Sequence, residues 1–258
     1  MKLYFAGVDC KAYLTIVSRH NQRALGTYYS LKNRDMSKYL KNLRSDFFLD
    51  SGAFTAFTQN KKIDLKAYCD FIKKNKKSLA LYASLDVIGD WKATRKNQEF
   101  MEKQGLKPLA TFHHGSPLSE LRRLIAKYDY IALGGLVPLT RTPDKLKKWL
   151  DICFSIIKVD TKVHGFGINS FNIWKRYPFY SVDATSWLSP SKFKRFLKFD
   201  NGQASSFGSL QRTQKKDEII RLDLETKHYT ELCDMQIQEY MKMEKFVTRL
   251  WEQRGIVW

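Results

Sequence analysis

The chain has 258 residues, of which 43% are hydrophobic, a length that allows one large domain or two small ones. Its formal net charge of +19 comes from 45 Lys and Arg against 26 Asp and Glu. Solubility alone requires a net charge of only about 2 to 8, so this excess of positive charge favours a polyanionic partner. The sequence has no apolar run of about 18 residues and no long apolar segment near its start. It therefore argues against membrane association and secretion and predicts a cytoplasmic protein.

Short apolar runs alternate with amphipathic stretches along the chain. The runs, which are predicted strands, cover residues 3–8, 47–49, 79–87, 108–112, 130–133, 162–168, 179–182 and 196–199. The amphipathic stretches, which are predicted helices, include residues 65–74, 91–104, 119–128 and 142–157. Eight strands with helical spacers in a chain of this length predict an α/β fold, a (β/α)₈ TIM barrel. A doubly wound open sheet is the alternative, although no glycine-rich nucleotide motif follows any run.

Three further segments complete the predicted organisation. The first connection, residues 10–45, is long for one helix and holds either an extra strand or an active-site loop. Residues 200–214 are rich in Gly and Ser and are predicted to form a flexible loop. Residues 213–254 are predicted to be a helical C-terminal segment that packs one face on the barrel. The simplest interpretation is one domain, 1–258.

Several of the apolar runs end in acidic or small residues, as buried parallel strands do when they deliver chemistry at their C-terminal ends. Asp50 closes the run 47–49, and Ser51-Gly52-Ala53 follows it. An aspartate here either faces the site or caps the next helix. Asp86 and Asp183 close two other runs. Gly134-Gly135-Leu136 follows a fourth run and allows close ligand approach or forms a plain turn.

The order of these motifs over about residues 1–200 resembles the tRNA-guanine transglycosylase superfamily, which exchanges guanine for a 7-deazaguanine at a sugar carbon. The family carries Asp-Ser-Gly-Gly-Phe where this chain has residues 50–54. The resemblance implies that Asp50 transfers protons and that Asp86 reads the Watson–Crick edge of the base. It implies further substrate-binding positions at Phe54, His114, Gly134, Gly135, Leu136, His164 and Gly165. His164 also has a plain alternative, a buried and hydrogen-bonded histidine.

The nucleophile is the main departure from the family pattern. The family places it at the second aspartate of a Val-Asp-Met-Phe-Asp segment, whereas residues 182–186 here read Val-Asp-Ala-Thr-Ser. Asp183 is interpreted as the catalytic nucleophile, because serine attacks a glycosidic carbon poorly without a base. Ser186 at the family position leaves loss of covalent chemistry as the other interpretation.

Two family features are missing. No Cys-x-Cys-x-x-Cys cluster is present, and the four cysteines are isolated, so no metal, cofactor or zinc subdomain is expected. The family's Pro-Thr-Arg stretch is replaced by residues 187–191. A small, zinc-free, basic chain resembles the DpdA-like DNA transglycosylases of phages and bacterial modification clusters.

This resemblance implies a glycosyltransferase whose partners are DNA and a free 7-deazaguanine base. Trp187 is expected to fill the gap left by a flipped base. The residues expected to hold the phosphates are Lys192, Lys194, Arg195 and Lys198. The alternatives are a non-catalytic nucleic-acid-binding barrel and a tRNA transglycosylase that dispenses with zinc.

Overall fold

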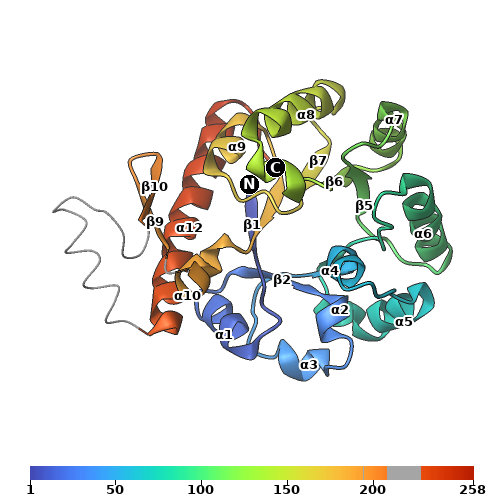
Figure 1. Ribbon diagram of the computed structural model, residues 1–258, viewed down its shortest axis with the longest axis horizontal. Coiled ribbons are helices and arrows are strands. Elements are labelled where there is room, and N and C mark those ends of the chain that lie inside the picture. Colours follow the sequence, from blue (N-terminus) through green and yellow to red (C-terminus); the bar gives the residue numbers. More distant parts are fainter. Residues whose placement is uncertain (194, 208–227) are drawn as a thin grey trace.

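The structure is a computed structural model that describes residues 1–193, 195–207 and 228–258. In these residues eight parallel strands form one curled sheet and alternate with helices along the chain, a (β/α)₈ TIM-like fold. Figure 1 shows the helices as an outer ring around the strands. The strands are β1 (Lys2–Ala6), β2 (Arg23–Thr27), β3 (Phe47–Asp50), β4 (Leu81–Tyr82), β5 (Ala110–His113), β6 (Tyr130–Gly134), β7 (Lys162–Gly165) and β8 (Ser181–Ala184).

The sheet order is β4-β3-β2-β1-β8-β7-β6-β5, so its two end strands are β4 and β5. These ends meet at a single parallel bridge between Ala83 and Leu109. Leu109 donates its N–H to the carbonyl of Tyr82 at 2.8 Å, and the Ser84 N–H donates to the carbonyl of Leu109 at 3.1 Å. We call this short contact between residues 82–84 and 109 the seam of the barrel.

The helices cover the outside of the sheet. They are α1 (Lys11–Arg19), α2 (Tyr28–Leu31), α3 (Met36–Tyr39), α4 (Ala53–Thr58), α5 (Leu65–Asn75), α6 (Trp91–Lys103), α7 (Leu118–Lys127), α8 (Pro143–Ile156), α9 (Phe171–Arg176), α10 (Ser189–Phe193) and α12 (Tyr229–Gln253). Short 3₁₀ turns are η1 (Lys76–Ser78), η2 (Val137–Arg141) and η3 (Ser186–Leu188). Asp64 and Asp90 cap α5 and α6, accepting the N–H of Ala67 at 2.6 Å and of Ala93 at 3.0 Å.

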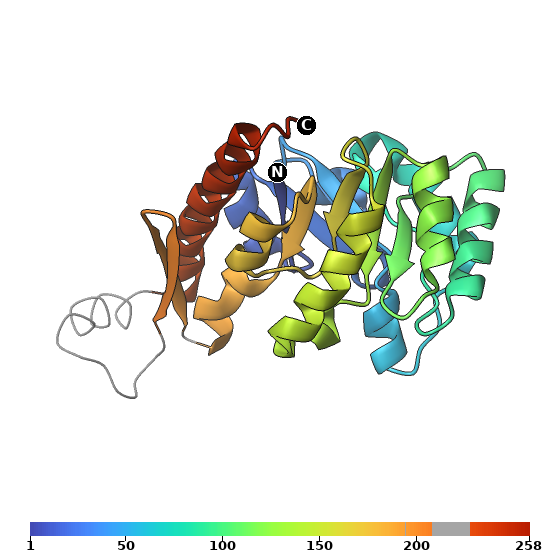
Figure 2. The same ribbon diagram turned by 90° about the horizontal axis from the view of Figure 1, so that it is seen from above.

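Two apolar layers hold the fold together. The larger one lies between the sheet and the helices and buries residues such as Phe5, Phe47 and Phe179. The smaller one fills the barrel interior and consists of Tyr4, Ala6, Leu25, Phe48, Ala83, Leu109 and Ala132. Because both faces of each strand are buried, the strands read as continuous apolar runs. In Figure 2 the arrowheads of the strands point away from the end of the barrel where the two termini lie.

The structure decides between the two options for the first connection and corrects one strand prediction. The long first connection contains strand β2, which is one of the two options predicted for it. Residues 196–199, predicted as the last barrel strand, instead belong to a separate antiparallel hairpin of β9 (Phe196–Asp200) and β10 (Gln203–Phe207). Asn201 and Gly202 form its turn with φ of 45° and 76°, a pair of left-handed residues suited to a tight hairpin.

This hairpin also corrects the flexible loop predicted for residues 200–214, at least as far as Phe207. The remainder of that loop lies outside the described residues, as does the part of the predicted C-terminal helix before residue 228. The rest of that helix is confirmed as α12, which packs along β9, α10 and α1. Figure 1 shows the hairpin lying against α12, outside the ring of barrel helices.

Side chains of α12 anchor the hairpin and the first strand. Gln236 pairs with the backbone of Leu197 through bonds of 2.8 and 2.9 Å, and Glu239 accepts the Phe199 N–H at 2.7 Å. Glu244 accepts the N–H of Leu3 at 3.0 Å. Among the described helices, none combines the length and apolar character needed to cross a membrane.

Candidate functional site

Asp50 is the last residue of β3, at the C-terminal end of the barrel. Its Oδ2 accepts the N–H of Gly52 at 3.1 Å. Gly52 has a φ of 76°, and a Cβ there would lie 2.6 Å from Cβ of Tyr29, so only glycine suits this turn. The N-cap of α4 is Gly52 itself, so Asp50 does not hold the cap position of the alternative interpretation.

The electrostatic setting of Asp50 is unusual. Burial raises its pKa to about 7, and the negative charges of Asp86 and Asp183 add to the effect, while the Gly52 N–H opposes it. Asp50 and Asp183 lie in the last residues of β3 and β8, Asp86 follows β4, and the charges of Asp86 and Asp183 act on the pKa of Asp50. At neutral pH a large fraction of Asp50 carries a proton and is able to donate it.

Asp183 lies near the end of β8 and is 7% exposed. Its Oδ1 accepts the N–H of Gly167 at 2.8 Å and lies 3.4 Å from Nε2 of His164. Ser186, the competing nucleophile, begins η3, and its hydroxyl bonds to the hydroxyl of Tyr240 on α12 at 2.6 Å. The geometry therefore favours Asp183 over Ser186 as the group presented to the barrel.

A histidine that the sequence left aside completes the cluster. His113 ends β5, and its Nε2 lies 3.0 Å from Oδ2 of Asp86. Burial alone lowers the pKa of His113, but the Asp86 carboxylate, with help from Asp50, outweighs it and raises that pKa. His114, the predicted base contact, is exposed and lies edge-on to Trp149 at 4.8 Å. The histidine beside Asp86 is therefore His113, and the base contact of His114 stays a prediction.

Below the carboxylates the barrel interior is aromatic. His164 is fully buried and is surrounded by the rings of Tyr4, Phe48 and Phe166 at 6.2, 5.0 and 4.5 Å. The structure therefore agrees with the alternative of a buried, hydrogen-bonded His164: the side chain is buried, and its Nδ1 lies 2.6 Å from Ser181 Oγ. Phe166 follows His164 by two residues and so shares its face of the strand, a signal that the sequence offered.

The glycines at the strand ends differ in what they do. A Cβ on Gly134 would lie 2.7 Å from Thr111 and 3.0 Å from the His113 ring, so this glycine leaves room for those side chains. Gly135 is exposed with a φ of 69°, and Leu136 is fully buried. The backbone of this turn remains a predicted contact for a ligand.

Gly165 corrects a prediction. A Cβ on it would lie 2.8 Å from the Phe179 ring and 3.1 Å from Ile168, both in the layer between sheet and helices. The residue therefore faces outward from the barrel, because it alternates with inward-facing His164 and Phe166. Its role is close packing of β7 and not the lining of a pocket floor.

Trp187 is a second correction. It is fully buried, donates its indole N–H to the Ala6 carbonyl at 2.8 Å, and packs edge-to-face on Phe5 and Tyr13. A side chain fixed in the core in this way cannot fill a gap in a DNA duplex. The exposed aromatic residues near the strand ends are instead Phe54 and Phe57, 52% and 59% exposed, on the same face of α4.

The predicted phosphate contacts are exposed where the structure describes them. Lys192 lies on α10, Arg195 follows it, and Lys198 is on β9. Lys194 lies outside the described residues. Three basic side chains are thus available to solvent on one stretch that follows the strand of Asp183.

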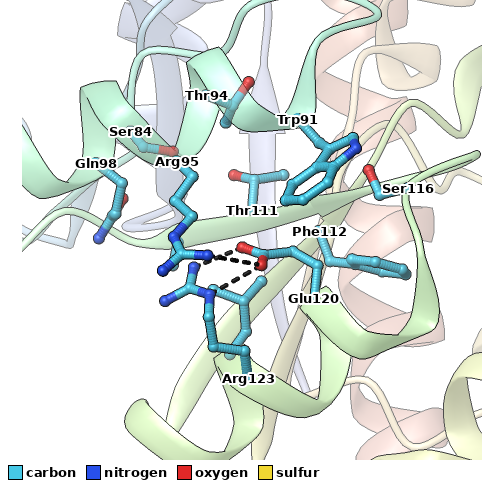
Figure 3. Close-up of a pocket in the computed structure, with 12 residues that line it drawn as sticks. Ser84, Trp91, Thr94, Arg95, Gln98, Thr111, Phe112, Ser116, Glu120 and Arg123 are labelled. Atoms are coloured by element: carbon cyan, nitrogen blue, oxygen red, sulfur yellow. Dashed lines mark hydrogen bonds and ion pairs between the residues drawn. The ribbon is translucent and has the colours of Figure 1, made fainter.

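A separate small cavity lies against β5, between α6 and α7 (Figure 3). Figure 3 shows Glu120 joined to Arg123 and Arg95, at 2.5 and 3.9 Å respectively. The volume open to the centre of a water molecule is about 10 Å³, and none of Asp50, Asp86 or Asp183 lines it. We assign this cavity to packing of the outer layer.

Among the described side chains, no three His, Cys, Asp or Glu groups converge closely enough to hold a metal ion. No protein-family model and no curated protein matches this chain. The chemistry of the site is therefore argued from its geometry. One carboxyl group at the C-terminal end of the barrel tends to hold a proton, and a second one accepts a backbone N–H, two states suited to acid and nucleophile roles at one reacting carbon.

Proposed function

We propose that the chain is a DNA-guanine transglycosylase that exchanges guanine in DNA for a free 7-deazaguanine base in the cytoplasm. The observation that carries the proposal is the pairing of Asp50, whose pKa is raised to about 7, with Asp183, which is held by the Gly167 N–H. The net charge of +19 supports a nucleic-acid substrate, and the motif order described above supports the choice of base exchange.

In the proposed first half-reaction a target deoxyguanosine is extruded from the duplex so that its sugar carbon becomes accessible. The carboxylate of Asp183 forms a bond to C1′ while the bond from C1′ to N9 of guanine breaks. Asp50 gives its proton to the departing guanine. The product is a covalent sugar–enzyme intermediate with an ionised Asp50.

In the second half-reaction the incoming 7-deazaguanine gives its N9 proton to Asp50 and attacks C1′. The bond to Asp183 breaks, and its electron pair returns to the carboxylate. Asp86 and His113 stand beside this centre as an ion pair of 3.0 Å, which supplies both an acceptor and a donor for the polar edge of a base. Each proton is thus returned, and no cofactor enters the balance.

The direct test is incorporation of labelled guanine or 7-deazaguanine into duplex DNA. Wild-type protein is expected to incorporate label, and Asp183→Asn is expected to lose exchange while it keeps its affinity for DNA. Asp90→Asn, which alters only the cap of α6, is the matched control with normal exchange. Full turnover by Asp183→Asn would remove the covalent assignment.

Two further measurements separate this proposal from a tRNA transglycosylase and from a non-catalytic barrel. Equal amounts of DNA and tRNA in one exchange reaction show which nucleic acid is the substrate, and preferential labelling of tRNA would transfer the chain to the tRNA-modifying group. Tight DNA binding with no incorporation of any base would favour a non-catalytic nucleic-acid-binding barrel.

A further inference from the structure

A chain of polar side chains runs from Asp183 into the closed interior of the barrel. The Tyr130 hydroxyl lies 2.6 Å from Ser181 Oγ, and Ser181 Oγ lies 2.6 Å from Nδ1 of His164. The other ring nitrogen, Nε2, lies 3.4 Å from Oδ1 of Asp183. Ser181 and His164 are both fully buried. The chain thus connects β6, β7 and β8 below the catalytic end of the barrel.

One arrangement of the protons in this chain gives both hydroxyl groups and Nδ1 of His164 a hydrogen-bond partner. Burial raises the pKa of Tyr130 far above its usual range, so Tyr130 keeps its O–H. Among the described residues the acceptor that Tyr130 meets is Ser181. In this arrangement Ser181 donates its own proton to Nδ1 of His164, which is then the unprotonated nitrogen. The remaining ring proton therefore sits on Nε2 and points toward the carboxylate of Asp183.

This N–H donor is not yet in a full hydrogen bond. At 3.4 Å the contact is longer than an ordinary hydrogen bond, and Nε2 has no hydrogen-bond partner within the described residues. A buried donor without a partner is costly, so its position needs a reason. Catalytic hydrogen bonds are often long before substrate binds and shorten during the reaction.

Both donors near Asp183 converge on one oxygen. The Gly167 N–H reaches Oδ1 at 2.8 Å, and His164 Nε2 approaches the same Oδ1. The second oxygen, Oδ2, has no recorded bond to the described residues and is the one left to form a bond. The two oxygens of this carboxylate are thereby distinguished before any substrate arrives.

We propose, building on the proposed function, that His164 is a positioning residue that presents Oδ2 of Asp183 to the sugar and holds Oδ1. When the incoming base attacks C1′, the bond from C1′ to Oδ2 breaks and its electron pair returns to the carboxylate. The Nε2–H of His164 and the Gly167 N–H stabilise the negative charge that reappears on Oδ1. The histidine therefore serves the second half-reaction more than the first.

The key comparison is His164→Leu against His164→Gln. Leucine removes the donor at similar size, whereas glutamine keeps an N–H on its side-chain amide. For His164→Leu we expect the second half-reaction to slow by about 10²- to 10³-fold, the usual effect of losing one such donor. The covalent protein–DNA adduct should then accumulate on denaturing gels. His164→Gln should restore turnover at least in part.

The matched control is His20→Leu. His20 also lies beside an aspartate, Asp234 at 3.1 Å, but it is at the end of α1 outside the barrel interior. This variant should leave both half-reactions unchanged. Ser181→Ala provides a second test should His164→Leu fold poorly, because it removes the proton donor to Nδ1 and should cause the same adduct to accumulate to a smaller extent.

A spectroscopic measurement tests the arrangement without any activity. Long-range nitrogen–proton NMR on the wild-type protein distinguishes the two ring nitrogens, and His164→Gln identifies which signal is lost. We expect the Nε2 signal to carry the proton that points toward Asp183. A proton on Nδ1 would overturn the proposal, as would His164→Leu turning over normally without adduct. If wild-type protein shows no exchange at all, the proposed function fails, and the NMR result alone decides the role of His164.

Discussion

Asp50 and Asp183 show how neighbours divide one functional group into two roles. Asp50 is half-buried, the charges of Asp86 and Asp183 act on it against two backbone N–H groups, and its pKa rises to about 7. Asp183 has a backbone N–H at 2.8 Å and an imidazole nitrogen at 3.4 Å on its Oδ1. The first group therefore tends to hold a proton at neutral pH, and the second is supplied with donors that suit a charged carboxylate.

The raised pKa of Asp50 predicts how stability depends on pH. The folded protein holds this proton up to about pH 7, whereas the unfolded chain releases it near 3.8. The folded state thus binds more protons between these values, so this group lowers the free energy of unfolding as pH rises from about 4 to 7. Asp50→Asn should remove that loss and become more stable than wild type at pH 8, by at most about 4 kcal/mol.

Denaturant titrations of both proteins at pH 5 and pH 8 measure this difference. Asp70→Asn, which changes an exposed aspartate on α5, should show no such pH dependence. If Asp50→Asn is less stable than wild type at both pH values, the carboxyl group is charged in the folded state and cannot act as the acid.

The residues at strand ends divide into those that sequence can predict and those it cannot. An aspartate that closes an apolar run, such as Asp50 or Asp183, lies at the C-terminal edge whichever way the strand faces. The side of the sheet to which a residue points is harder to predict, because barrel strands are apolar on both sides and the alternation of side chains carries little signal. For this reason the sequence could not show that His113 points inward, that Gly165 points outward, or that Trp187 is in the core.

Gly165→Ala tests the outward facing of β7. The added Cβ would lie 2.8 Å from the Phe179 ring, so the outer layer must shift, at a cost of about 1–3 kcal/mol. Thermal and denaturant unfolding should show this loss, while exchange by the folded fraction stays normal. A loss of exchange at unchanged stability would return Gly165 to the lining of the site.

At the scale of elements, local signals explain both what was predicted and what was missed. The helices over 65–74 and 91–104 were predicted from their amphipathic pattern, and in the structure an aspartate caps each of them. β2 remained one of two options for the first connection because Arg23-Ala-Leu-Gly-Thr27 has one β-branched residue and a glycine, a weak strand pattern. Residues 196–199 alternate in burial, which is typical of a half-exposed hairpin and not of a barrel strand.

The anchoring of the hairpin on α12 leads to a prediction at Gln236. This side chain is fully buried and satisfies both backbone groups of Leu197. Gln236→Leu should lower the free energy of unfolding by about 2–5 kcal/mol, since two buried backbone groups lose their partners at about 1–3 kcal/mol each. Gln238→Leu, on the exposed side of the same helix, should change stability by less than about 0.5 kcal/mol. Equal effects of the two variants would contradict this anchoring role.

At the scale of the whole molecule the charge distribution is uneven in a useful way. The net charge is +19, yet the C-terminal end of the barrel carries Asp50, Asp86 and Asp183 at or just after the ends of three strands. The positive surface attracts a polyanion over long range, and the acidic centre disfavours any phosphate that approaches the reacting position. Under the proposed function, only an uncharged part of the nucleic acid, a base with its sugar, is suited to this centre.

The phosphate contacts should appear in the salt dependence of DNA binding. The logarithm of the binding constant should fall linearly with the logarithm of salt concentration, by about 0.9 for each phosphate neutralised. Replacing Lys192, Arg195 and Lys198 together by Gln should reduce that slope by up to about 2.7. Fluorescence anisotropy at several salt concentrations measures it, and Asp183→Asn should keep the wild-type slope. A triple variant with an unchanged slope would place the phosphate contacts elsewhere.

The seam between β4 and β5 has a dynamic consequence. Asp86 follows one side of it and His113 ends the other, so their ion pair bridges the place where the barrel has the fewest backbone bonds. Because Asp86 raises the pKa of His113, this bridge is charged at low pH and weakens as pH rises through the pKa of the folded state. Amide hydrogens at Ser84 and Leu109 should therefore exchange with deuterium early, and with growing opening frequency in alkaline buffer beyond the intrinsic rate increase. The barrel would then open transiently at its seam, beside Asp86 and His113, the groups proposed to receive the base.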